Sequence, residues 1–148
     1  MKKLLLLATF TAFSLFAFSQ EPMRVGFSKF RIIKSDGTTS TLYNNLCHAY
    51  FLTQNGVSYM FLDNSNHTAL SEIEVCKPLS KFPTSLVYTC VSMADNYKTM
   101  MTIDTREDGD YIMLSLNDDT ILEYKINKIE IAAEDDAVLL KLLKRHIR

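Results

Sequence analysis

The sequence predicts a mostly-β fold: an antiparallel meander of about eight strands that forms a barrel or a sandwich and ends in one C-terminal α-helix. Three observations lead to this prediction. The apolar runs of the 148-residue chain are short and rich in Val, Ile, Tyr, Phe and Thr, which is typical of β-strands. The 4 glycines and 3 prolines punctuate these runs, as turns require. Helical periodicity is sustained only near the C-terminus.

The first 19 residues have the pattern of a secretion signal. Lys2 and Lys3 form a positive start, and the apolar segment Leu4–Phe18 that follows is shorter than the roughly 20 residues of a membrane-spanning helix. Small residues in the segment Ala17–Ser19 suit cleavage before Gln20. An uncleaved membrane anchor is the alternative interpretation.

We therefore expect residues 1–19 to be a signal peptide and residues 20–148 to form a single β-rich domain. No later stretch approaches the length of a membrane span, so we expect no integral span in the mature chain. The short, lysine-led signal is typical of bacteria, which indicates an exported protein that is periplasmic or secreted.

Nine segments alternate apolar and polar residues between turn signals, and each is an expected strand. In chain order they are Arg24–Lys34, Ser40–Asn44, Leu46–Thr53, Val57–Asp63, Ala69–Cys76, Leu86–Ala94, Tyr97–Thr105, Asp110–Leu116 and Thr120–Ala132. Asp36-Gly37 and Asn55-Gly56 are strong hairpin signals because Asn, Asp and Gly tolerate a positive φ. Short polar loops at 95–96, 106–109 and 117–119 account for the later turns.

The last three expected strands allow a prediction of register. Loops at 106–109 and 117–119 make these pairs: Ile103 with Ile112, Met101 with Leu114, Leu114 with Leu122, and Ile112 with Tyr124. One face is then apolar, and the opposite, polar face carries Glu123, which we expect to be exposed. A slip of one residue would mix the faces. After Ile126 the apolar positions change parity, which predicts a β-bulge near Asn127-Lys128.

The expected hairpin at residues 46–63 differs because both of its faces are apolar. One face can meet the core, and the other needs a cover, which could be the C-terminal helix, a partner or a ligand. The second face carries Tyr50, Tyr59 and Phe61, which are therefore our candidate ligand-binding residues.

The segment Glu134–Ile147 is the one good helix. Asp135 and Asp136 fall in its expected first turn, and basic residues gather toward its end, as the helix dipole favours. An apolar stripe that includes Leu139 predicts a helix docked on the sheet. A helix that binds a membrane surface or a partner is the alternative.

The chain has three cysteines, Cys47, Cys76 and Cys90. An exported protein meets an oxidising compartment, so a disulfide is expected, and Cys76–Cys90 is favoured because it closes the shortest loop. The other two pairings, or no bridge, stay open because neighbours in a sheet need not be neighbours in sequence.

Recognisable catalytic, metal and cofactor motifs are absent from the sequence. Cys47 and His48 are adjacent on an expected strand, so their side chains would point to opposite faces and could not form a dyad. The acidic loop near residue 108 fails the calcium-loop template, because Arg106 and Ser115 stand where acidic ligands belong. A formal net charge of −1 argues against a nucleic-acid partner. We expect no enzyme activity, no metal and no cofactor.

These observations favour an exported, non-catalytic binding protein that holds a small apolar ligand in or against a β-barrel. The alternative is a protein-interaction module, such as an inhibitor or an envelope-assembly component, that uses the apolar hairpin 46–63 or the C-terminal helix. A small hydrolase with residues gathered from several strands is a third hypothesis.

Overall fold

The structure is a computed structural model that describes residues 21–43, 48–63, 70–92, 96–116 and 118–146. Within these ranges it describes only the backbone at 42–43, 63, 70–78, 142–143 and 145–146. The expected signal peptide, Cys47 and His67 lie outside the described residues, so predictions that concern them stay predictions.

Strands dominate the described chain, and a single described helix follows them. The elements are β1 (Met23–Ile33), β2 (Thr39–Tyr43), β3 (His48–Gln54), β4 (Val57–Asp63), β5 (Leu70–Lys81), β6 (Ser85–Ser92), β7 (Lys98–Arg106), β8 (Gly109–Ser115), β9 (Ile121–Ile131) and α2 (Ala137–His146). The predicted fold class is confirmed. The predicted turns also form, since Asn55, Gly56, Gly37 and Gly109 all adopt a positive φ.

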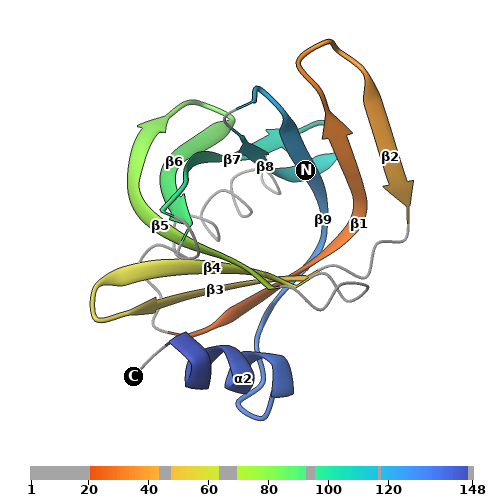
Figure 1. Cartoon of the computed structure of the whole chain (residues 1–148). Helices are drawn as coiled ribbons and strands as arrows, with labels where there is room; N and C mark the ends of the chain where they lie inside the picture. The colour runs from red at the N-terminus through yellow and green to blue at the C-terminus, as the bar shows by residue number, and fades with distance from the viewer. Residues whose placement is uncertain (1–20, 44–47, 64–69, 93–95, 117, 147–148) are drawn as a thin grey trace.

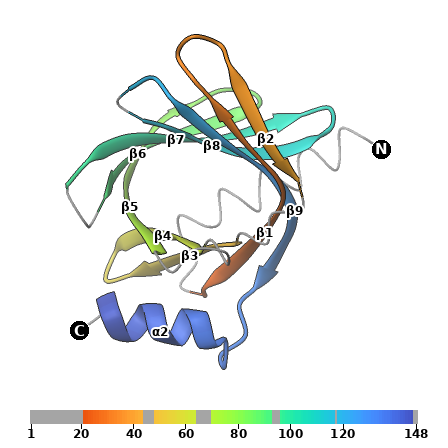
Figure 2. The same cartoon turned by 45° about the vertical axis from the view of Figure 1, so that its right-hand side comes forward.

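The strands close into a barrel rather than a two-sheet sandwich. Each strand from β3 to β9 pairs antiparallel with the next, and β1 pairs with both β3 and β9. Eight strands therefore form a ring of hydrogen-bonded neighbours, which Figure 1 and Figure 2 show from two sides. β2 stands outside the ring and pairs with the C-terminal half of β1, from Lys29 to Ile33.

The predicted register of β7, β8 and β9 is confirmed at all four pairs. The bulge is confirmed as well: Gly26 pairs with Lys128 and Phe27 with Ile126, which leaves Asn127 as the extra residue. This bulge keeps Ile129 packed against the core after the change of parity.

β5 is longer than predicted. It continues past the expected end at Cys76 to Lys81, because register shifts on both sides of Pro78 absorb the irregularity that a proline brings to a strand. Bulges of this kind also bend a strand, which helps a sheet to close.

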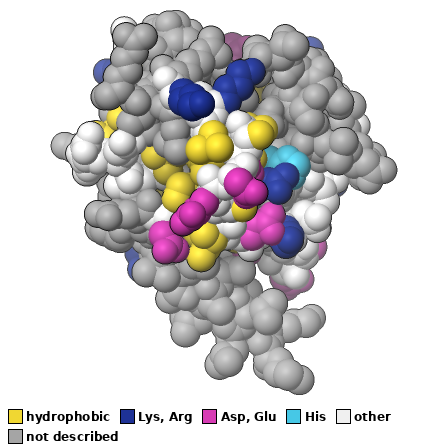
Figure 3. All heavy atoms as spheres, turned by 90° about the horizontal axis from the view of Figure 1, so that it is seen from below, with side chains coloured by type: hydrophobic (Ala, Val, Ile, Leu, Met, Phe, Trp, Pro, Cys, Tyr) yellow, Lys and Arg dark blue, Asp and Glu magenta, His cyan; other side chains and the backbone are white. Residues whose placement is uncertain are grey.

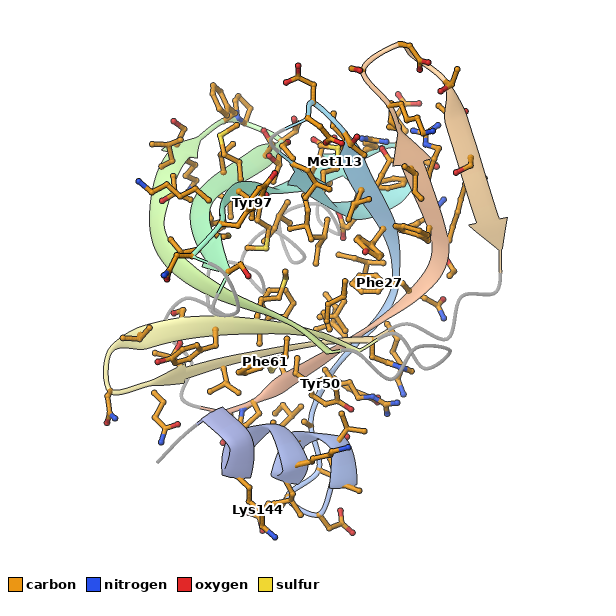
Figure 4. All side chains as sticks on the ribbon, in the orientation of Figure 1. Phe27, Tyr50, Phe61, Tyr97, Met113 and Lys144 are labelled. Carbon is orange, nitrogen blue, oxygen red and sulfur yellow. The ribbon has the colours of Figure 1, made fainter. Side chains whose placement is uncertain are left out.

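The main core fills the inner face of the ring. Its buried members come from seven of the eight ring strands and are Val25, Phe27, Ala49, Phe51, Met60, Leu62, Leu86, Tyr88, Cys90, Met101, Ile103, Ile112, Leu114 and Tyr124. In Figure 4, Phe27 points into the ring, in the direction away from α2.

A second, smaller core lies between the β3–β4 hairpin and α2. Tyr50, Leu52 and Phe61 of the hairpin pack there against Ala132 and Leu139, and Figure 2 shows α2 lying across this face. The second apolar face of the hairpin is thus covered by the chain's own helix.

The helix begins later than predicted, at Ala137 instead of Glu134. Asp136 is its N-cap rather than a member of its first turn: Oδ1 accepts hydrogen bonds from the backbone N–H groups of Val138 (3.0 Å) and Leu139 (3.1 Å). An N-cap has non-helical backbone angles, so a helix starts only after it.

Candidate ligand site in the barrel

The wall of the barrel interior is apolar. The hydrophobic cluster that lines it, in the described part of the chain, carries as polar groups the hydroxyls of Tyr88 and Tyr124 and the thiol of Cys90. Strand alternation produces this wall, because residues two apart on a strand share a face. A ring of eight strands is just wide enough to be filled by side chains or to hold one small ligand.

Tyr88 supplies a buried polar group to this wall. It lies on β6, opposite Met101 of β7, and only 6% of the residue is exposed. Burial raises the pKa of its phenol above the usual value. Among the described residues, the buried side-chain polar atoms without a hydrogen-bond partner are Nε of Arg24 and Nε of Arg31, and the hydroxyl of Tyr88 is not one of them.

A hollow of about 840 Å³ lies at the rim of the barrel beside this wall. It is formed where β6 and β8 end and β7 and β9 begin, and it is lined by Thr89, Cys90, Val91, Lys98, Thr99, Met100, Ser115, Leu116, Asp119 and Ile121. Cys90 and Thr99 pair across β6 and β7 and are both buried. The hydroxyl of Thr99 donates to the carbonyl oxygen of Ser115, so this polar group is already satisfied.

The candidate residues Tyr50, Tyr59 and Phe61 lie together, but on the opposite side of the sheet from the barrel interior. Tyr50 and Phe61 are 2% and 0% exposed beneath α2, and Figure 4 shows both between the β3–β4 hairpin and the helix. Tyr59 stacks on Phe61 with 6.0 Å between the ring centroids. The hydroxyl of Tyr50 donates to Asp136 at 3.0 Å. Their role in binding a ligand stays a prediction.

The backbone places Cys76 beside Cys90, but it does not show whether the two form a disulfide. Cys90 pairs with Val75, and the register shift between Val75 and Lys77 makes Cys76 the extra residue of a bulge at that point. The side chain of Cys76 and all of Cys47 lie outside the described atoms. The Cys76–Cys90 disulfide therefore stays a prediction.

Glu123 is buried on the outer face of the barrel, which corrects our expectation that it is exposed. Only 3% of the residue is exposed. Its two carboxylate oxygens accept from Arg31 at 2.7 Å and from Arg106 at 2.9 Å, and Arg106 also binds Asp104 at 2.8 Å. Long arginine side chains lie along the sheet and cover the carboxylate, a packing that simple alternation of polar and apolar residues does not reveal.

His48 faces outward from β3 and contacts Arg24 of β1, with 3.0 Å between Nε2 and Nη2. The described residues contain no group of three or more His, Cys, Asp and Glu side chains that could hold a metal. No described helix has the length and apolar character needed to cross a membrane.

Sequence reasoning did not single out Tyr88, a buried tyrosine of the barrel core. The available signal was the alternation Leu86, Tyr88, Cys90 on one face of an expected strand. That pattern predicts an inward ring, but it does not show which side chains surround it, because those come from distant strands.

Comparison with known proteins finds no match: no family model, no curated protein and no solved structure is similar to the chain at a significant level. The functional argument therefore rests on the geometry of the chain itself.

Proposed function

We propose that this protein is an exported, non-catalytic binding protein that holds a small apolar molecule in its β-barrel. The observation that carries the proposal is the hollow of about 840 Å³ at the barrel rim, next to the hydrophobic core cluster of the barrel. Sites for small ligands are mostly apolar concavities of roughly 300–1,000 Å³ with a few polar groups. Export is part of the proposal and rests on the signal pattern of residues 1–19.

We infer that the rim hollow is the entrance to this site. Buried Cys90 and Thr99 contribute to it, and so does Met100, which is 45% exposed. The lining residues come from both faces of the sheet, which puts the hollow at the rim of the barrel. An apolar molecule would pass there from water to the inner wall.

A second candidate function, binding of a partner protein, is favoured by the outer side of α2. Leu140 is 41% exposed there and Ile131 of the preceding strand is 61% exposed. Figure 3, which views the molecule from the α2 side, shows hydrophobic side chains among acidic and basic ones. The hairpin at 46–63 is a weaker candidate surface, because α2 covers Tyr50 and Phe61.

A titration with the neutral fluorescent probe N-phenyl-1-naphthylamine tests the proposal. We expect saturable binding of one probe per chain. Thr89→Trp fills the hollow and should weaken probe binding by about tenfold or more, because the ligand loses its space. Thr102→Trp is the matched control, since Thr102 lies on β7 but does not line the hollow.

A second control separates the two candidate functions. Leu140→Glu disrupts the exposed side of α2 and should leave probe affinity unchanged. Probe binding that is lost in Leu140→Glu but retained in Thr89→Trp would refute the barrel site in favour of the helix surface.

A further inference from the structure

We infer that the outer side of α2 is an interface with a second copy of this chain, in which the two helices pack antiparallel about a two-fold axis. The inference rests on the second candidate function, binding through the outer side of α2, and adds the identity of the partner. It does not depend on the barrel site. It is carried by the exposed side chains of the helix and by the separation of charge along it.

The centre of this outer side is an exposed apolar side chain beside a shallow concavity. Leu140 is 41% exposed, whereas Leu139 is buried against the β3–β4 hairpin. The concavity has a volume of about 490 Å³ and is lined by Ala137, Leu140, Lys141 and Lys144. These four residues have the spacing of one helix face, which points away from the barrel. The Leu140 side chain of a second copy would fill this concavity and leave water.

Charge is separated along the same side of the molecule. Glu134 and Asp135 are exposed in the turn before the helix, and Lys141 and Lys144 are exposed on the helix itself. None of these four side chains belongs to an ion pair of the described residues. Figure 3 shows hydrophobic side chains among charged ones of both signs on this side. The surface is therefore acidic at one end and basic at the other, with Leu140 between them.

A surface of this kind is complementary to itself. In a two-fold dimer the same patch meets its own copy in the reverse direction. An antiparallel arrangement places Lys144 of one copy beside Glu134 of the second. The same register brings Lys141 beside Ala137, whose small side chain leaves room for the lysine stem. The two Leu140 side chains then meet close to the axis, and every other contact occurs twice.

An anionic membrane suits this surface less well than a second copy does. Lipid phosphates would attract the lysines, but they would repel Glu134 and Asp135 beside them. The contact is small, because a helix of 10 residues is about 15 Å long. Stable interfaces bury about 800 Å² on each partner. We therefore expect a weak dimer that forms reversibly as the concentration rises.

Sedimentation equilibrium of two charge-reversal variants, alone and mixed, tests the inference. Lys144→Glu brings two acidic groups together at each end of the interface, and Glu134→Lys brings two basic groups together there. We expect each variant alone to have a dissociation constant about tenfold or more above that of the unmodified protein, because like charges repel. In an equimolar mixture the two changes meet as opposite charges, so heterodimers should form with about the affinity of the unmodified protein.

Lys34→Glu is the matched control for the change of charge. Lys34 is exposed in the β1–β2 turn, at the opposite end of the barrel from α2 (Figure 1). Its dissociation constant should equal that of the unmodified protein. Leu140→Glu should abolish association, because it would bury two like charges at the axis. Circular dichroism of each variant checks that the fold is retained.

The outcomes separate this inference from the barrel site. A monomer at every concentration up to roughly 1 mM would overturn the dimer. Two single variants that do not associate when mixed would overturn its antiparallel arrangement. A monomer that binds phosphatidylglycerol vesicles, and loses this binding in Lys144→Glu, would overturn the second copy in favour of a membrane surface. The probe titration decides the barrel site whichever of these results is found.

Discussion

The carboxylate of Glu123 lies between two arginines on the outer face of the barrel, where Arg31 reaches it from β1 and Arg106 from β7. The guanidinium of Arg106 also lies over the ring of Tyr111, with 4.2 Å from Cζ to the ring centroid. A charge that is this buried is tolerated only because both of its oxygens are satisfied by cationic donors.

Removal of this carboxylate should therefore destabilise the fold. We expect Glu123→Ala to lower the free energy of unfolding by about 1–3 kcal/mol, since Arg31 loses its carboxylate partner and Arg106 keeps only Asp104. Glu107→Ala, in the exposed turn after β7, should change it by less than about 0.5 kcal/mol. Urea denaturation measures both values, and equal losses would contradict the buried position of Glu123.

Asp108 gives the protein a defined response to acid. Hydrogen bonds from Tyr111 at 2.6 Å and from Lys125 at 2.9 Å lower the pKa of this carboxyl to about 2. The folded pKa lies below the unfolded value of about 3.9, so the folded state favours the ionised form. The resulting stability is present above about pH 4 and is lost as the pH falls toward 2.

Asp108→Asn should remove this contribution. We expect the difference in unfolding free energy between the unmodified protein and Asp108→Asn to be constant above about pH 5 and to shrink between about pH 4 and 2. Tyr111→Phe should weaken the same pH dependence, because it removes the largest cause of the lowered pKa. A difference that stays constant down to pH 2 would show that the contacts of Asp108 do not form in solution.

At the scale of elements, α2 is held by a cap and a docked face. Asp136 caps its first turn and also accepts from the hydroxyl of Tyr50, so one carboxylate joins the helix start to β3. Leu139 is 3% exposed against the hairpin, whereas its neighbour Leu140 is 41% exposed. A helix this short is marginal in water without a surface to pack against.

The two adjacent leucines make a matched pair. Leu139→Ala should cost about 2–5 kcal/mol of unfolding free energy by opening a cavity in the second core. Leu140→Ala should cost less than about 0.5 kcal/mol. Thermal and urea unfolding of both variants provide the measurement. A chain ending at Ala133 that still melts at the unmodified temperature would mean that the helix contributes nothing to the fold.

At the scale of the whole molecule, the barrel joins the two ends of the meander. β1 pairs with β9 from Met23 to Ile33, while its other edge meets β3 and then β2. The ring is therefore closed, because β1 is hydrogen-bonded to β3 on one side and to β9 on the other. The β1–β2 hairpin extends beyond the ring (Figure 1). Closure creates the enclosed apolar wall on which the binding proposal depends.

The prediction of export also concerns the whole chain. We expect mass spectrometry of the exported protein to show a mature chain that begins near Gln20, because the small residues before it suit signal peptidase. An exported, soluble form that retains Met1 would contradict the signal-peptide prediction.

The sequence alone was sufficient for features that depend on neighbours along the chain. Alternation and turn chemistry predicted the strands, the Asn55-Gly56 turn, the register from Met101 to Tyr124 and the bulge at Asn127, because each is decided by a few adjacent residues. Our prediction placed the start of α2 too early, at Glu134 instead of Ala137, because acidic residues are favoured both at an N-cap and in a first helical turn.

Only the tertiary structure decided what depends on contacts between distant segments. These are the closure of β1 on β9, the choice of α2 as cover for Tyr50 and Phe61, and the burial of Glu123 between Arg31 and Arg106. Local alternation shows which face a side chain takes, but not what lies across from it. A ring brings residues a hundred positions apart into contact, so the partners of each inward and outward side chain follow from closure and not from the pattern of any single strand.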